Sequence, residues 1–474
     1  MNRTGVFLAA AGVLALIAVV AAVPRMHGGT TTTTTGAVTP IDPATAKDGS
    51  LAMTARLSHP FVGLGRQDVF LTVDLRAVEV PGAQRAPVNL AMVIDRSGSM
   101  SGFKLNQAKQ AARQLVAQLT PADRLAIVHY GSDVKSMDGL MATPENKARL
   151  LAFIDGIWDD GGTNIGAGLA TGRDLLLAAK SDFRVNRLVL ISDGQPTEGV
   201  TDFGGLTGIV RDVRSTGVSV SSIGVGDDFN ENLMEAIAEV GAGAYAYLQD
   251  ASQLASIFQK DLNAAGTQVA RGVALTFKVP QGTQLQRVLG YSQVARAFEG
   301  TTELVTVSMP DFAAAQQERV VVHLTVDAAQ AGRTVTVSDL ALTYTDLLKN
   351  AGIKSEAHLA AMATDQADVV VKNQDKDAVV FAARARAADN SRKAAELLGD
   401  GDLEGAKALF KTNEAIFGEA AAVAGAPAVA PDIQAQQAQA EAFEQARDEQ
   451  SRKAAQKAVR NKARVDYGLM GSTY

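Results

Sequence analysis

The chain has 474 residues, no cysteine and a formal net charge of −6. The lack of cysteine excludes thiolate metal sites, cysteine nucleophiles, disulfide bonds and a lipid-modified N-terminal cysteine. The acidic balance argues against nucleic acid as a partner. A chain of this length with 47% hydrophobic residues is expected to form about two to four globular units.

The N-terminus predicts export. Residues 5–23 form an apolar run without a charge, preceded by Arg3. About 20 such residues span a bilayer as a helix, so residues 1–23 are expected to be a membrane anchor. A signal peptide cleaved near Ala22 is the alternative. Because the positive end stays inside, both place the remainder on the periplasmic or extracytoplasmic face of the inner or cytoplasmic membrane.

The pattern then changes four times. Residues 24–50 are rich in Thr, Gly and Pro and are predicted to be a flexible linker. Residues 51–87 alternate between apolar and polar side chains, which indicates β strands, and residues 268–345 do the same. Between them, residues 88–264 alternate strands with helices. We therefore expect one β domain with an α/β unit inserted into it.

The α/β unit is predicted to be Rossmann-like, with a largely parallel central sheet and helices on both faces. Its strands are short apolar runs, which is typical of parallel strands covered on both sides. The expected strands are 88–94, 123–131, 186–192, 218–226 and 244–249, and the expected helices are 104–119, 143–157, 165–180, 202–217, 227–241 and 251–262.

The C-terminal third is predicted to be helical. Residues 355–420 are rich in Ala and charge, and residues 392–410 read as a helical hairpin. Residues 419–431 are expected to form a linker that opens the last region, 421–474, and residues 432–464 one polar helix. The basic residues of that helix either favour an acidic partner or lipid, or form a solvated face; they are Arg452, Lys453, Lys457, Arg460, Lys462 and Arg464.

Polar side chains follow two of the predicted strands. Asp95, Ser97 and Ser99 follow the first, at alternate positions that point the same way in an extended segment. Asp193 follows another strand, and Thr163 lies in a Gly-rich loop before a helix. Ligands bind outside the carboxyl ends of strands in open α/β sheets. If the two strands are neighbours, five oxygens converge, a donor set that suits Mg²⁺. The lack of His and Cys in this set argues against Zn²⁺ and Cu.

At these residues the sequence resembles the von Willebrand factor type A domain and its metal-ion-dependent adhesion site. The pattern is Asp-x-Ser-x-Ser, a Thr in a later loop and an Asp after a following strand, matched here by Asp95, Ser97, Ser99, Thr163 and Asp193. The resemblance implies Mg²⁺, or Mn²⁺ or Ca²⁺, held by two carboxylates and three hydroxyls, with water often between the ion and one carboxylate. It covers about residues 88–264, and it is nearest to exported bacterial members and the inter-α-trypsin inhibitor heavy chains.

The function expected from this resemblance is metal-dependent protein–protein interaction, in adhesion or complex assembly at the cell envelope. A partner's Asp or Glu would complete the coordination of the cation. The alternative is an envelope scaffold or assembly factor that acts through its C-terminal helices, with a structural metal. We expect no enzyme, because no acid–base pair or nucleophile accompanies the site; Ser101 and Lys104 match a Ser-x-x-Lys pattern without its partner motifs.

Two further residues are left with two interpretations each. Trp158 is either a contact residue beside the metal or a packing anchor. His129 lies in a predicted strand and is expected to be a core or rim residue.

Overall fold

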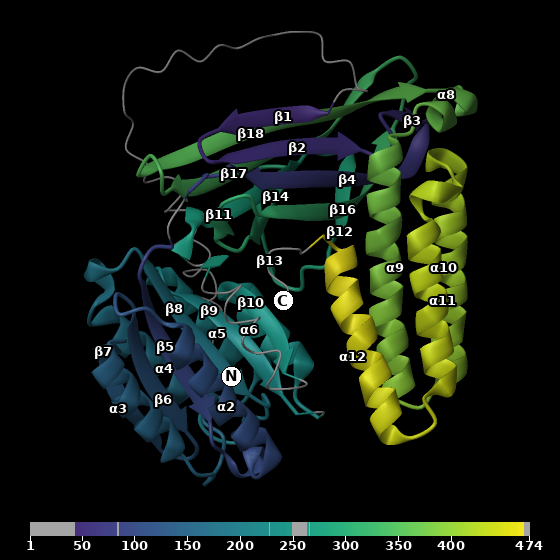
Figure 1. The fold of residues 1–474 in the computed structure, drawn as a ribbon. Coiled ribbons are helices and arrows are strands. Elements are labelled where there is room, and N and C mark those ends of the chain that lie inside the picture. Colours follow the sequence, from purple (N-terminus) through teal and green to yellow (C-terminus); the bar gives the residue numbers. More distant parts are fainter. Residues whose placement is uncertain (1–42, 83–84, 227, 249–262, 265, 469–474) are drawn as a thin grey trace, which may run out of the picture.

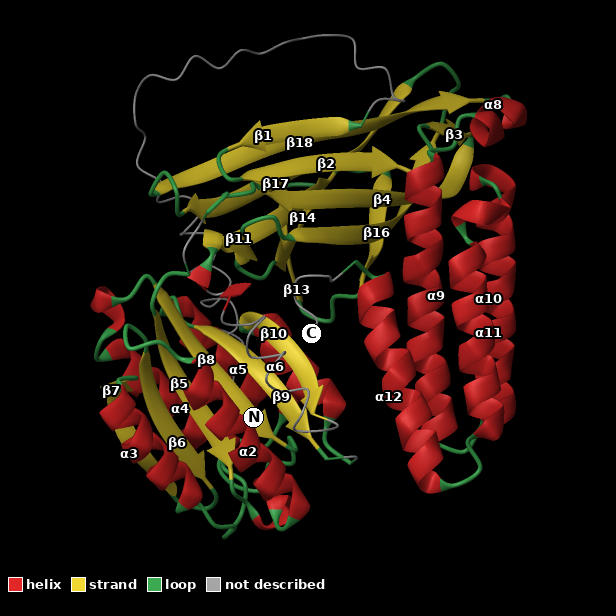
Figure 2. Ribbon diagram, in the orientation of Figure 1, coloured by secondary structure: helices red, strands yellow, loops and turns green. Residues whose placement is uncertain are grey.

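The computed structural model describes residues 43–82, 85–226, 228–248, 263–264 and 266–468. It has three parts: an α/β unit around a six-stranded sheet, two further sheets, and a bundle of C-terminal helices (Figure 1). Figure 2 shows the helices gathered in the first and third parts, whereas the second part is mostly strand. The predicted α/β fold with a flanking β region and C-terminal helices is therefore confirmed.

Three predicted segments lie wholly or largely outside the described residues. They are the N-terminal anchor or signal peptide, residues 24–42 of the predicted linker, and the helix expected at residues 251–262. Within the part of the chain that the structure describes, no helix combines the length and the apolar character that a membrane span requires.

The sheet of the α/β unit has the strand order β10-β9-β8-β5-β6-β7. Its strands are β5 (Val88–Asp95), β6 (Arg124–Tyr130), β7 (Val134–Met141), β8 (Val185–Ser192), β9 (Ser219–Val225) and β10 (Ala242–Leu248). All neighbouring pairs are parallel except β6 and β7. The sequence does not predict β7, because this edge strand has no fully buried side chain and therefore no apolar run.

Helices cover both faces of this sheet. They are α2 (Phe103–Gln118), α3 (Pro144–Asp155), α4 (Ile165–Leu177), α5 (Phe203–Ser215) and α6 (Glu231–Val240). Successive side chains of β5 point to opposite faces. Met92 and Ile94 pack in a core with α2 and α3, whereas Ala91 and Val93 pack in a core with α4, α5 and α6. The nearly all-apolar sequence of β5 follows from this double coverage.

The second part consists of two sheets that share one hydrophobic core. The first has the order β1-β2-β4-β16-β12, with β1 (Ala44–Asp48), β2 (Leu51–Leu57), β4 (Gly65–Ala77), β16 (Gln317–Ala328) and β12 (Thr283–Leu289). The second holds β13 (Val294–Glu299), β14 (Thr302–Ser308), β11 (Gln268–Val279), β15 (Phe312–Ala313), β17 (Thr334–Asp346), β18 (Ala351–Thr364) and β3 (Phe61–Gly63). Strand β4 precedes the α/β unit, β16 follows it, and the two pair from Gln317–Arg76 to Ala328–Gly65.

The predicted linker at residues 24–50 is wrong at its end, because Ala44–Asp48 is strand β1. It pairs with β2 in a hairpin whose two loop residues are Gly49 and Ser50. Gly49 has a φ of 72°, and a side chain there would clash with Asp346 and Tyr344. The Gly-Ser pair therefore forms the tight turn between two paired strands and is not part of a flexible linker.

The prediction of helix from residue 355 is also wrong at its start. Residues Ala351–Thr364 form β18, which pairs with β17 from Thr334–Met362 to Asp346–Ala351. Ser355, Leu359, Ala361 and Ala363 are buried at every second or fourth position. Alanine favours helix in isolation, but here pairing along a long partner strand and burial of one face outweigh that preference.

The C-terminal helices are α8 (Ala367–Lys372), α9 (Lys376–Gly399), α10 (Leu403–Ala424), α11 (Ala430–Gln445) and α12 (Glu449–Asp466). The expected hairpin corresponds to the end of α9 and the start of α10. The linker expected at residues 419–431 is wrong, because α10 continues to Ala424 and a single 3-10 turn, Ala426–Ala428, leads directly into α11.

The single polar helix expected at residues 432–464 is also wrong, because two helices, α11 and α12, occupy this segment. Phe443, 1% exposed, packs edge-on against Phe410 and holds the end of α11 against α10. The Asp448 side chain accepts a hydrogen bond from the Ser451 N–H (2.7 Å) and starts a new helix. The buried Phe443 near the end of α11 and the capping box at the start of α12 therefore separate the two helices.

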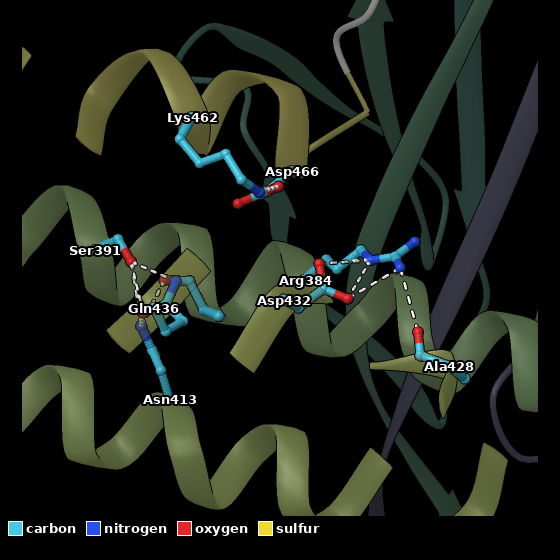
Figure 3. A network of polar contacts seen from close by, with 9 residues as sticks. Arg384, Ser391, Asn413, Ala428, Asp432, Gln436, Lys462 and Asp466 are labelled. Atoms are coloured by element: carbon cyan, nitrogen blue, oxygen red, sulfur yellow. Dashed lines mark hydrogen bonds and ion pairs between the residues drawn. The ribbon is translucent and has the colours of Figure 1, made fainter. Parts of the chain in front are cut away.

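Buried polar contacts join helices α9, α10 and α11 (Figure 3). The Asn413 side-chain amide donates to Gln436 Oε1 (2.9 Å) and to Ser391 Oγ (3.2 Å). Arg384 pairs with Asp432 at 3.0 Å. Because each buried polar group needs its partner, these contacts set the register of the three helices.

Candidate metal centre

The predicted site residues lie at one edge of the α/β sheet. Asp95 is the last residue of β5, and Asp193 directly follows β8. These strands are parallel neighbours, with Ile94 opposite Ile191. Parallel pairing places both carboxylates at the carboxyl end of the sheet, where ligands bind in this class of fold.

Asp95 is fully buried and held by two donors. The Ser192 hydroxyl donates to its Oδ2 (2.6 Å), and the Ser97 N–H donates to its Oδ1 (2.9 Å). Burial, with a smaller contribution from the nearby charge of Asp193, raises the pKa of Asp95 to about 6, against the effect of these hydrogen bonds. Ser192 was not predicted as a site residue, although it lies next to Asp193 in the sequence.

Asp193 is also fully buried, and its two oxygens differ. Oδ2 lies 3.1 Å from Nζ of Lys104, which is also 2.8 Å from Oδ1 of Asp228. Oδ1 has no hydrogen-bond partner. A buried carboxylate oxygen without a donor is costly. Asp193 thus presents an unpaired anionic oxygen at the predicted position of the cation.

The serine loop and the threonine loop are joined through their backbones. Ser97 Oγ lies 3.2 Å from Ser99 Oγ; Ser97 is buried and Ser99 is exposed. The Gly98 N–H donates to Gly161 O (3.1 Å), two residues before Thr163. The loops that carry the predicted serine and threonine ligands therefore meet at the edge that also holds the carboxylates.

The Thr163 loop is tied on its other side to the segment after β8. The Thr163 N–H donates to Thr197 Oγ1 (2.8 Å), and the Thr197 N–H donates back to Thr163 O (3.0 Å). Thr163 is 2% exposed. Its backbone is thus fixed by the same segment that begins with Asp193.

Arg96 connects two of the loops around the site. The sequence does not predict it as a site residue. The side chain is 2% exposed, donates to Asp160 O (3.2 Å) and forms an ion pair with Asp133. Its carbonyl accepts from the Asp160 N–H (2.8 Å). Gly131 packs closely against the same loop, because a Cβ at this position would lie only 2.2 Å from Asp160 O. One buried guanidinium thus links the loop after β6 to the Thr163 loop.

The donor set fits a hard divalent cation. All five predicted donors are oxygens, two from carboxylates and three from hydroxyls, which suits Mg²⁺, Mn²⁺ or Ca²⁺. Among the described residues, no three His, Cys, Asp or Glu side chains gather as a metal site by themselves. A cation at this edge would therefore depend on the hydroxyls as well as on Asp95 and Asp193.

Comparison with known proteins decides the family of this unit. The family model described as the von Willebrand factor type A domain matches residues 89–260. This segment is a von Willebrand factor type A domain. We call it the A domain below.

Curated relatives match part of this chain. YfbK of Escherichia coli (strain K12) is 30% identical over 234 residues, which is 48% of this chain and 40% of YfbK. The inter-alpha-trypsin inhibitor heavy chain H1 of Bos taurus is 32% identical over 157 residues, 32% of this chain and 17% of that protein. The chain thus matches two fifths or less of these relatives' length.

Two solved structures share the fold over 88% of this chain. The von Willebrand factor type A protein from Catenulispora acidiphila has a TM-score of 0.65 at 17% identity, with 96% of that chain covered. The ArnB paralog VWA2 from Sulfolobus acidocaldarius has a TM-score of 0.54 at 18% identity, with 99% covered. The likeness extends well beyond the A domain, so the flanking parts also belong to the shared fold.

Trp158 and His129 have different positions in the A domain. Trp158 is 62% exposed, and the Lys135 ammonium lies 5.2 Å from its ring centre. It is therefore not a packing anchor. His129 is buried, with its ring 5.4 Å from that of Phe153, as expected for a core residue. Burial lowers the pKa of His129 to about 4, so it is neutral at pH 7.

Helix α6 of the A domain carries three glutamates at helical spacing that contact the rest of the protein. Glu231 pairs with Arg460 of α12 (3.4 Å). Glu235 pairs with Arg392 of α9 (3.0 Å). Glu239 accepts from the Ser292 hydroxyl (2.7 Å), which follows β12. The basic end of α12 therefore meets an acidic face within the same chain, and the interpretation of a solvated face is wrong for Arg460.

Proposed function

We propose that this protein is a metal-dependent interaction module at the cell envelope, which docks an acidic residue of a partner protein onto a divalent cation. Domains of the von Willebrand factor type A family generally mediate protein–protein interaction. The observation that supports metal dependence is Asp193 Oδ1, which is buried without a partner while its neighbour Asp95 is held by two donors. A cation is the group that would satisfy this oxygen.

The five residues divide the work of holding the cation. Asp95 and Asp193 supply negative charge, whereas Ser97, Ser99 and Thr163 supply neutral oxygens. Bound there, Mg²⁺ supplies a Lewis-acidic centre with a coordination position for an outside carboxylate. Because Ser99 is exposed, this edge opens to solvent and a partner's side chain can reach it.

We propose binding rather than catalysis at this edge. Lys104 is held between Asp193 and Asp228, so its ammonium serves to position them. His129 packs against Phe153 in the core. Neither side chain is placed to exchange a proton with a molecule bound at the cation.

The envelope location rests on the sequence alone. The apolar run at residues 5–23 is long enough to act as a membrane anchor or to direct export as a signal peptide. Cell fractionation of the native protein tests this part. We expect the chain in the membrane or periplasmic fraction, and recovery in the cytoplasm would contradict it.

The alternative function is a scaffold that acts through the C-terminal helices around a structural metal. The contacts of α12 weaken this alternative. Arg460 is 12% exposed and paired with Glu231, and Lys457 is 8% exposed and donates to Gly226 O (3.0 Å). These basic side chains are engaged with the A domain, so an outside partner would have to displace them.

Partner capture from envelope extract tests the proposal. The immobilised full chain should capture a protein in Mg²⁺ and release it in EDTA, and Asp95→Ala should abolish the capture. The milder variant Ser99→Ala should weaken it, while Ser101→Ala, an exposed serine two residues away, should not. EDTA-sensitive capture that survives in Asp95→Ala would refute the proposal.

A further inference from the structure

Three exposed aromatic side chains lie in the segments that carry the predicted metal ligands. Phe103 is 70% exposed, Trp158 62% and Phe203 43%. Phe103 begins α2 four residues after Ser99, Trp158 lies five residues before Thr163, and Phe203 begins α5 ten residues after Asp193. Large aromatic residues left exposed together mark binding surfaces. Each of the three segments that carry the predicted ligands thus presents one aromatic side chain.

The same loops are acidic on their exposed side. The side chains of Asp133, Asp160 and Asp228 are 58%, 67% and 56% exposed. Of the basic side chains nearby, Arg96 is 2% exposed and Lys104 17%, and both are paired with buried or rim carboxylates. Lys135 is 48% exposed and lies 3.9 Å from Asp133, so its charge is shared with a rim carboxylate. We call the following exposed residues the rim: Phe103, Trp158, Phe203, Asp133, Asp159, Asp160, Asp202 and Asp228.

An acidic rim is at odds with an acidic ligand. Asp95 and Asp193 together balance the charge of a divalent cation, so the filled centre offers an approaching carboxylate no excess positive charge. The rim carboxylates then repel it over about 8 Å at physiological ionic strength. A partner overcomes this repulsion when basic side chains beside its carboxylate face the rim.

We infer that the partner presents its metal-binding Asp or Glu within a basic and apolar surface, with Lys or Arg opposite the rim carboxylates and apolar side chains against Trp158 and Phe103. This inference rests on the proposed function, because it describes the partner of the same site. It adds that the rim, and not the cation alone, selects among acidic residues. Acidic or uncharged surroundings on the partner are disfavoured.

A random peptide library displayed on phage tests the inference. The library is panned on the full chain in Mg²⁺ and eluted with EDTA. The selected peptides should carry an Asp or Glu with Lys or Arg within three positions, at least threefold above the unselected library. Selected peptides with an Asp or Glu in neutral or acidic surroundings would overturn the inference and leave the proposed function standing. A lack of Mg²⁺-dependent selection would overturn both.

Two variants test the rim directly with a selected peptide. Trp158→Ser should weaken peptide binding at least tenfold, while Mg²⁺ binding measured by calorimetry stays unchanged. Phe298→Ser is the matched control, because Phe298 is 73% exposed on β13, outside the rim, and should bind the peptide normally.

Charge is tested separately. Asp159→Lys should reduce the preference for Lys-flanked over Glu-flanked forms of the selected peptide by at least threefold. Equal loss in the Trp158→Ser and Phe298→Ser variants, or an unchanged preference in Asp159→Lys, would overturn the inference.

Discussion

Arg460 of α12 lies 3.4 Å from Glu231 of α6, and both side chains are nearly buried at 12% and 11% exposure. The last described helix is therefore held against the A domain (Figure 1). Three residues earlier in α12, Lys457 donates to Gly226 O, in the loop between β9 and α6. The Asn230 N–H of the same loop donates to Asp193 O (2.7 Å). The C-terminal bundle thus supports the loop on which a predicted metal ligand rests.

The contact at Glu231 should make the stability of the protein depend on pH. Burial raises the pKa of Glu231 from 4.5 to about 7, although the charge of Arg460 opposes the shift. Between these two values the folded state holds the proton and the unfolded state has released it. The free energy of unfolding therefore falls as the pH rises from about 4.5 to about 7. A shift of this size corresponds to about 3 kcal/mol.

The variant Glu231→Gln removes this titration. Thermal unfolding should show equal melting temperatures for the variant and the native protein near pH 4.5, with the variant melting higher by pH 8. Parallel melting curves across this range would contradict the role given to Glu231.

Two glycines of the A domain should respond oppositely to alanine. A Cβ at Gly168 in α4 would stand 2.6 Å from Cδ1 of Tyr130 and 3.0 Å from Val93. Gly168→Ala should cost about 1–3 kcal/mol by overpacking. Gly208 in α5 has nothing within 4 Å, so Gly208→Ala should stabilise the helix by about 0.5–1 kcal/mol. Urea unfolding measures both, and a stable Gly168→Ala would contradict the close packing of α4 on the sheet.

The buried contacts of Asn413 should be needed for the stability of the helical bundle. Asn413 is 0% exposed and donates to Gln436, Ser391 and Ala387 O. Asn413→Ala removes these buried hydrogen bonds and should cost about 1–3 kcal/mol. Its exposed neighbour is the control, since Glu414→Ala should change the free energy of unfolding by less than about 0.5 kcal/mol. Similar losses in both variants would argue against the network.

Arg96 should act on the metal site without touching the metal. Arg96→Lys keeps the charge but loses the planar group that reaches both Asp133 and the Asp160 carbonyl. We expect Mg²⁺ to bind about tenfold more weakly while the far-UV circular dichroism spectrum is unchanged. An unchanged affinity for Mg²⁺ in this variant would mean that the contacts of Arg96 do not position the Thr163 loop.

The sequence predicts the A domain well because its strands are strongly apolar and its turns are polar. The placement of Asp95 and Asp193 follows from strand ends that are visible in the sequence. Arg96 and Lys104 are missed because their partners lie in other loops, at Asp133 and Asp228, and their roles exist only after folding.

Outside the A domain, composition misleads. The alanine-rich β18 has the composition of a helix, and only its antiparallel pairing with the preceding strand β17 and the burial of one face make it a strand. The docking of α12 does leave a signal: Glu231, Glu235 and Glu239 are spaced at helical intervals, and so are Lys457, Arg460 and Arg464. Two complementary charged stripes would have suggested an internal contact.

Calorimetric titration with Mg²⁺ is the most direct test of the metal centre. The native chain should bind Mg²⁺ at one site, Ser99→Ala should bind it at least tenfold more weakly, and Ser101→Ala should match the native chain. Both serines are exposed in the same short segment, so their folding consequences are matched. Equal affinity in the two variants, or no Mg²⁺ binding by the native chain, would contradict the assignment of Asp95, Ser97, Ser99, Thr163 and Asp193 as a metal site.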